Sequence, residues 1–158
     1  MRALVGPRRL GDTLSVQGFG DSFYVPNGTP EELIARAART NALDQDLWHR
    51  GIGRGRAVNL GKAWSERDGN AGEWWAKGLG RYINSVEREE AHKAINEWAD
   101  GDAVAGHVGY GNDLFCTHDF AKDAGETSVF HCSNRDWLTT AYGLKFVTLP
   151  ELAEQIAM

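Results

Sequence analysis

In the second half of the chain, apolar residues recur at helical spacing in some segments and in short continuous runs in others, and the two kinds of segment alternate. The pattern predicts helices over residues 81–100, 103–110, 134–142 and from 148 onward, and strands over 113–117 and 144–147. Helices and strands in this order are typical of a parallel sheet that is covered by helices. The pattern therefore predicts an α/β fold.

Capping residues mark two helix starts. Thr29 and Glu32 form a capping box, which begins a helix that we expect to end near residue 41. Thr148 and Glu151 form the same box before the last helix. In both boxes the two side chains satisfy backbone amides that the first helical turn leaves without partners.

The first half of the chain has weaker patterns. Residues 1–28 predict an irregular lead-in, and residues 43–79 mix helical and turn features. Glycines in the second segment alternate with Arg54 and Arg56. Such a stretch can bind phosphate, because glycines free the backbone amides and arginines fork onto phosphate oxygens. We favour the alternative, a flexible loop with solvated arginines, because the stretch matches neither the P-loop nor the dinucleotide-binding fingerprint.

Length and charge narrow the class of protein. The 158 residues fit one domain spanning 1–158, and the net charge of -5 argues against a protein that coats nucleic acid non-specifically. A nuclease stays compatible with this charge, because a metal site itself needs acidic residues. No apolar run is long enough to span a membrane and the first residues lack the apolar core of a signal peptide, so we expect a cytoplasmic protein.

The two cysteines do not predict a disulfide or a strong zinc site. Cys116 and Cys132 lie near His118 and His131, and all four are suitable zinc ligands. Neither pair has the spacing of a zinc knuckle, so a structural zinc is the weaker interpretation.

The stretch from Asp102 to Asp119 holds the best candidate chemistry. Gly101 is expected to end the helix over 81–100, and Asp102 to cap the next one. That helix would rise about 13 Å and the following strand would return about 16 Å, so an antiparallel pair brings Asp102 and Asp119 to one edge. Asp113 falls at the opposite end. Two carboxylates beyond the carboxyl end of a strand predict a divalent-metal site.

The residues around these carboxylates also carry a family resemblance. Asp102-Ala-Val-Ala-Gly-His and Asp113-Leu-Phe-Cys-Thr-His-Asp119, with the tail Phe146-Val-Thr-Leu-Pro-Glu-Leu, resemble the C-terminal half of PIN-domain proteins. These are metal-dependent ribonucleases that include toxins of bacterial toxin/antitoxin pairs. The resemblance is best over 81–158 and implies a PIN-like three-layer sandwich. The first strand ending in Asp that PIN domains carry has no counterpart in residues 1–28, so the chain is expected to lack that strand or to replace it.

The resemblance implies an endoribonuclease that hydrolyses phosphodiesters with Mg²⁺ or Mn²⁺. Asp102 and Asp119 would bind the metal, and Glu97 is one of three glutamates that could complete the ligand set. Thr117 would position a carboxylate or a water. An RNA substrate, an antitoxin and a second copy of the chain are the implied partners, with no membrane.

Two alternatives remain open at this point. Arg54 and Arg56 are candidate RNA contacts if the glycine-rich stretch binds phosphate. A degenerate PIN-like domain would keep the fold as an interaction module and lack a complete set of acids. The number of carboxylates that converge distinguishes the enzyme from the module.

Overall fold

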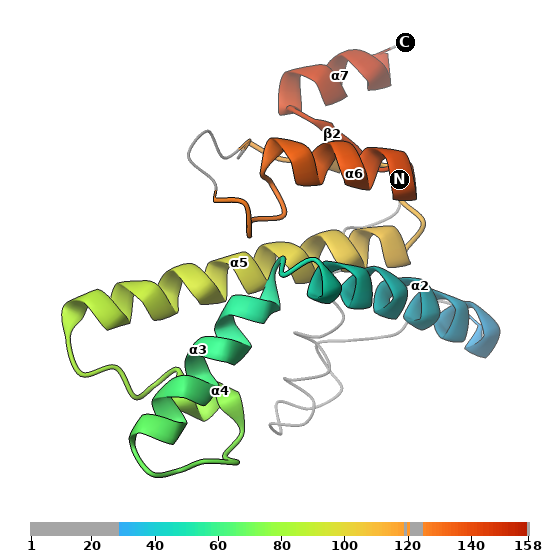
Figure 1. The fold of residues 1–158 in the computed structure, drawn as a ribbon. Coiled ribbons are helices and arrows are strands. Elements are labelled where there is room, and N and C mark those ends of the chain that lie inside the picture. The colour runs from blue at the N-terminus through green and yellow to red at the C-terminus, as the bar shows by residue number, and fades with distance from the viewer. Residues whose placement is uncertain (1–28, 119, 121–124, 158) are drawn as a thin grey trace. The chain divides into compact units, whose positions relative to one another are not determined.

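The computed structural model describes residues 29–118, 120 and 125–157 (Figure 1). The predicted lead-in and Asp119 lie outside these residues. The elements are α2 (Pro30–His49), α3 (Arg54–Arg67), α4 (Trp75–Gly78), α5 (Ser85–Gly109), β1 (Leu114–Cys116), α6 (Cys132–Tyr142), β2 (Lys145–Val147) and α7 (Leu149–Ala157). The described chain is therefore mostly helical, with one small sheet.

The chain divides into two compact units, which we describe separately. The described part of unit 1 contains residues 29–45, 102–118 and 136–157. The described part of unit 2 contains residues 46–101, 120 and 125–135. Helices α2, α5 and α6 each contribute residues to both units.

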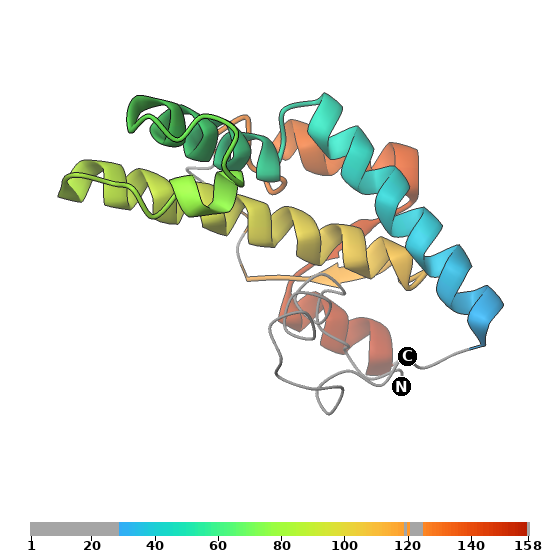
Figure 2. The same ribbon diagram turned by 90° about the horizontal axis from the view of Figure 1, so that it is seen from below.

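Unit 1 contains the sheet, in which β1 pairs with β2 in parallel. Phe115 is the register partner of Phe146, and their ring centroids are 5.6 Å apart. Leu138 and Leu144 are fully buried, and His107 of α5 packs edge-on against Phe115 with the centroids 5.1 Å apart. Figure 2 shows β1 alongside the C-terminal part of α5. The predicted parallel pairing of the two strands is confirmed.

The capping boxes are also confirmed, although one helix is longer than predicted. The Glu32 amide donates to Thr29 Oγ1 at 3.3 Å, and the Thr29 amide donates to Glu32 Oε2 at 3.0 Å. The Thr148 amide likewise donates to Glu151 Oε2 at 2.7 Å. Helix α2 continues to His49, past the end that we predicted near residue 41.

The N-terminal part of α2 meets the C-terminal end of α5 at a glycine. A Cβ on Gly109 would overlap the side chain of Thr40, so the two helices approach more closely than a larger residue would allow. Arg39 donates to the Gly109 carbonyl from Nε at 3.1 Å and from Nη2 at 2.7 Å. This bond satisfies a carbonyl at the end of α5, where helical partners are missing.

In unit 2, α3 and α5 run antiparallel. Arg56 near the start of α3 pairs with Glu97, and Arg67 at its end pairs with Glu87 at the start of α5, with N–O distances of 3.1 and 2.9 Å. Residue numbers thus rise along α3 as they fall along α5. A core cluster lies between these helices and α4, and it consists of Ala57, Leu79 and Ala94 with Leu60, Trp75 and Trp98 packed around it.

Helices α3 and α4 touch at the backbone, and Figures 1 and 2 both show them side by side. A Cβ on Gly61 would overlap the carbonyl oxygen of Trp75, and a Cβ on Gly78 would overlap the carbonyl oxygen of Gly61. Only glycine fits at both positions, and this contact holds α4 against α3.

The predicted break at Gly101 is wrong, because α5 continues from Ser85 to Gly109 without interruption. Gly101 is buried, and a Cβ there would lie 3.3 Å from Gly53 Cα and 3.8 Å from Leu47 Cδ1. The glycine therefore permits close packing and does not end the helix. Asp102 consequently lies inside α5 and is not a helix cap.

The predicted flexible loop around Arg54 and Arg56 is also wrong, because α3 begins at Arg54. Gly51 and Gly53 adopt positive φ angles of 72° and 71°, which turn the chain between α2 and α3. Ile52, between them, is 2% exposed, and its amide donates to the Leu47 carbonyl at 2.9 Å. The alternating glycines thus form an ordered turn and a helix start.

None of the described helices is both long and apolar enough to cross a lipid bilayer.

Candidate functional site

Asp102 lies in the part of α5 that belongs to unit 1, and its side chain is half-buried. The chain leaves α5 through a turn in which Gly111 has a φ of 72°, and it returns as β1. The contact between His107 and Phe115 shows which turn of α5 lies beside which residue of β1. From that contact, Asp102 is about 7.5 Å back along α5, and Thr117 is about 6.6 Å forward along the strand direction. Asp102 and Thr117 are therefore displaced by about the same distance from this contact, measured along the strand direction.

Thr117 is the first residue after β1, and its amide donates to the Val147 carbonyl at 3.0 Å. This bond extends the ladder between β1 and β2 by one residue, which holds the backbone of Thr117 at the carboxyl end of the sheet. Asp119 is two residues further and lies outside the described residues. Asp113 is exposed and precedes β1, and its carbonyl accepts from the Lys145 amide at 2.7 Å.

His107, which packs against Phe115, is a titratable residue of this region. Its Nε2 is buried and has no hydrogen-bond partner in the described part of the chain. Burial lowers the pKa of His107, while the Leu114 backbone and the charge of Asp113 oppose that shift. The neutral imidazole is thus the form that this packing favours.

Glu97 belongs to unit 2 and is bonded to two donors. Arg56 Nη1 donates to Glu97 Oε1 at 3.1 Å, and Thr127 Oγ1 donates to Glu97 Oε2 at 3.3 Å. In a continuous helix, five residues correspond to a rotation of about 500°, so Glu97 and Asp102 leave α5 in different directions.

The two arginines proposed as RNA contacts lie in the first turn of α3. Arg56 bonds Glu97 and lies 4.0 Å from Glu90, and its side chain is about one-third exposed, at 34%. The guanidinium carbon of Arg54 lies 5.3 Å from the centre of the Trp48 ring, within cation–π range. Arg56 is thus paired with a carboxylate, and Arg54 with an aromatic ring.

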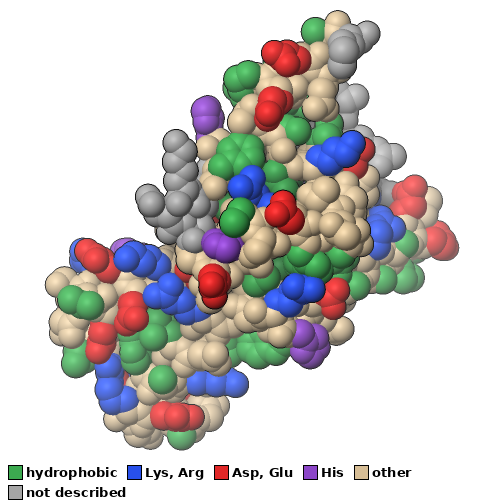
Figure 3. Space-filling model, turned by 45° about the horizontal axis from the view of Figure 1, so that its top comes forward, with side chains coloured by type: hydrophobic (Ala, Val, Ile, Leu, Met, Phe, Trp, Pro, Cys, Tyr) green, Lys and Arg blue, Asp and Glu red, His purple; other side chains and the backbone are tan. Residues whose placement is uncertain are grey.

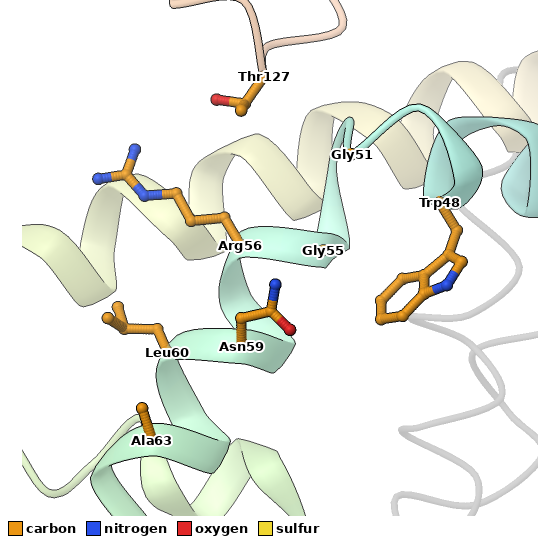
Figure 4. Close-up of a pocket in the computed structure, with 8 residues that line it drawn as sticks. All are labelled: Trp48, Gly51, Gly55, Arg56, Asn59, Leu60, Ala63 and Thr127. Carbon is orange, nitrogen blue, oxygen red and sulfur yellow. The ribbon is translucent and has the colours of Figure 1, made fainter.

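A cavity of about 650 Å³ lies in unit 2 along one face of α3 (Figure 4). It is lined by Trp48, Gly51, Gly55, Arg56, Asn59, Leu60, Ala63 and Thr127. We did not predict this cavity from the sequence, because we assigned the glycine-rich stretch that forms part of its wall to a loop. The spacing of Gly55, Asn59 and Ala63, four residues apart, is the sequence feature that could have indicated one helical face.

The described residues do not form a complete metal site. No group of three or more His, Cys, Asp and Glu side chains in that part of the chain could hold a metal ion together. Cys116 and Cys132 are both free and exposed. A carboxylate metal site at the end of β1 therefore needs at least one ligand from outside the described residues.

Comparisons with models of protein families, with curated proteins and with solved structures gave no match for this chain.

Proposed function

We propose that this chain is a divalent-metal-dependent nuclease of the PIN type, which hydrolyses phosphodiesters in RNA at the carboxyl end of β1. The observation that carries the proposal is the parallel pairing of β1 with β2 directly after the C-terminal end of α5. In open α/β sheets, ligands bind beyond the carboxyl ends of the strands. A PIN-like sandwich would place its acids at this edge, and the resemblance of residues 81–158 to PIN domains assigns Asp102 and Asp119 to that role.

The similar positions of Asp102 and Thr117 along the strand direction support the proposal further. The helix and the strand are joined by a short turn and packed through His107 and Phe115, so the chain beyond Thr117 emerges near the turn of α5 that carries Asp102. Asp119 follows two residues later in the sequence. Asp113 precedes β1 and belongs to the opposite end.

Each residue then has a distinct role. Asp102 and Asp119 would hold Mg²⁺ or Mn²⁺, because these ions prefer carboxylate oxygens. A metal held there would supply an activated water and would stabilise the leaving oxygen. Thr117 would orient a carboxylate or the water through its hydroxyl group. Glu97 is a weaker ligand candidate, because Arg56 and Thr127 already bond both of its oxygens.

Cleavage of a labelled single-stranded RNA in the presence of Mn²⁺ tests this function. Asp102→Asn and Asp119→Asn should each lower the rate by at least about 10-fold to 100-fold, since loss of a ligand should cost no less than loss of its supporting residues. Asp113→Asn is the matched control and should keep nearly the full rate, because Asp113 is exposed at the other end of β1. Equal activity of Asp102→Asn and the unmodified protein would overturn the mechanism.

One observation favours a second candidate, an interaction module with the same fold and an incomplete set of acids. Glu97 is bound by donors, and the described residues contain no three-residue metal group. Absence of metal-dependent cleavage from a protein with an intact circular dichroism spectrum would favour this alternative. An antitoxin or a second copy of the chain is then the partner that the PIN resemblance implies.

A further inference from the structure

The cavity of unit 2 is a groove along one face of α3. Gly55, Asn59 and Ala63 lie four residues apart and so share a helical face, which runs for about 12 Å. A volume of about 650 Å³ is in the range of sites that hold small organic ligands. Gly55 leaves room in the groove, because a Cβ on it would meet nothing within 4 Å.

An exposed aromatic ring forms one wall of this groove. Trp48 is 38% exposed, and the guanidinium of Arg54 lies near its ring. Figure 4 shows the Trp48 indole and the Asn59 amide on the same side of α3. An indole beside an amide suits a flat heteroaromatic ligand, because the ring offers a surface for stacking and the amide can both donate and accept hydrogen bonds.

The charges around the groove argue against a phosphate as its main ligand. Arg56 donates to Glu97, and Glu90 lies 4.0 Å from the other end of its guanidinium. In Figure 4 the Arg56 side chain extends to the side of Thr127, away from the indole. A phosphate would have to compete with these carboxylates for Arg56.

Among the described residues visible in Figure 3, basic and acidic side chains are interspersed, and the chain as a whole carries a charge of -5. Proteins that bind duplexes through the phosphate backbone depend on clustered positive charge. Recognition in this groove therefore depends on a ring surface and a hydrogen-bonding edge.

From these features we infer that the groove binds an unstacked base of single-stranded nucleic acid, with the ring on Trp48 and its polar edge toward Asn59. The choice of RNA as the strand rests on the proposed nuclease function. Stacking on an aromatic side chain tolerates different bases, so any choice between bases would come from hydrogen bonds to the Asn59 amide.

Binding of a fluorescein-labelled single-stranded RNA, measured by anisotropy in EDTA, tests the inference without any cleavage. The full-length protein should bind the single strand more tightly than the matched duplex. Trp48→Leu should weaken binding about tenfold, because a stacking residue is lost. Trp74→Leu is the matched control and should leave binding unchanged, since Trp74 is also exposed, at 60%, but does not line the groove.

Filling the groove provides a second test that does not depend on removing a large side chain. Gly55→Leu should weaken binding by a similar factor, and Gly55→Ala by less, because the added side chain extends into open space. Alanine and leucine favour a helix more than glycine does, so both variants should fold. Equal binding of single strand and duplex, or unchanged binding by folded Gly55→Leu, would overturn the inference.

The same protein preparations separate this inference from the proposed function. Manganese-dependent cleavage without single-strand binding in EDTA would overturn the groove and leave the nuclease standing. Single-strand binding that is lost in Trp48→Leu but unchanged in Asp102→Asn would support the groove, whether or not the chain cleaves RNA.

Discussion

The surroundings of the small sheet in unit 1 and the contact between α3 and α4 in unit 2 are built from side chains of different size. In unit 1, the fully buried residues around the small sheet are large aliphatic ones, such as Leu138 and Leu144. In unit 2, α3 and α4 meet through Gly61 and Gly78, where the backbones themselves come into contact. A core of large residues is sensitive to lost volume, whereas a close helix contact is sensitive to added volume. These two regions should therefore be destabilised by opposite kinds of substitution.

The largest effect should come from removing volume in unit 1. Leu144→Ala deletes a side chain with no exposed surface next to β2, and it should lower the free energy of unfolding by about 2–5 kcal/mol. Chemical denaturation followed by circular dichroism measures this loss. Ile156→Ala in α7 is the control, since Ile156 is 69% exposed and should change stability by less than about 0.5 kcal/mol. Similar losses for both variants would contradict our description of this core.

A smaller loss should follow from adding volume in unit 2. Gly61→Ala places a methyl group against the Trp75 carbonyl, and it should cost about 1–3 kcal/mol although alanine favours a helix. Gly80→Ala is the matched control, because a Cβ there would only reach ordinary contact at 3.5 Å from the Lys77 carbonyl. If Gly61→Ala is as stable as Gly80→Ala in urea, α3 and α4 do not touch at the backbone.

The smallest effect concerns pH and unit 1. Burial lowers the pKa of His107 from its ordinary value of 6.5, so at low pH the unfolded chain takes up a proton before the folded chain does. The stability of the protein should therefore decrease as the pH falls below about 6.5, and His107→Asn should reduce that dependence.

Denaturation at about pH 7 and about pH 5 measures the difference. His92→Asn, at an exposed histidine of α5 in unit 2, serves as the control and should keep the pH dependence of the unmodified protein. An unchanged pH dependence in His107→Asn would show that this side chain is not desolvated.

Features that depend on neighbouring residues could be predicted from the sequence. The capping boxes at Thr29 and Thr148 join side chains and amides three residues apart, so their geometry is local. The strands at 113–117 and 144–147 and the helix ending before Gly143 were also placed correctly within a residue or two, as β1, β2 and α6. Alternation of these elements was sufficient to predict their parallel pairing.

Two of the errors share one cause, which is that glycine can end a helix, turn the chain or allow close packing. At Gly101 a sequence pattern typical of a helix end occurs within a helix, because the backbone of Gly53 packs against it. At Gly51 and Gly53 the residues do turn the chain, and the helix that follows was hidden because its buried face contains small residues such as Ala57 and Gly61. Hydrophobic periodicity does not detect a face of this kind.

The candidate site also has a part that could be predicted from the sequence and a part that could not. The sequence predicted that Asp102 and Asp119 meet at one edge, from the lengths of a helix and a strand alone, and this stays a prediction because Asp119 lies outside the described residues. It could not predict that Glu97 bonds Arg56, because those residues are 41 positions apart and meet only through the antiparallel packing of α3 and α5. The groove beside Trp48 likewise brings together residues that are distant in the sequence, because Thr127 lines it together with residues of α3.

By itself, the sequence determined the two capping boxes, the order of the elements after α5 and the parallel pairing of β1 with β2. These features follow from hydrogen bonds and hydrophobic periodicity within short segments. Only the tertiary structure decided that Gly101 continues α5, that Arg56 is held by a carboxylate and that Gly55 borders a groove. Those outcomes depend on which distant backbone comes within a few ångströms, and sequence spacing does not encode that distance.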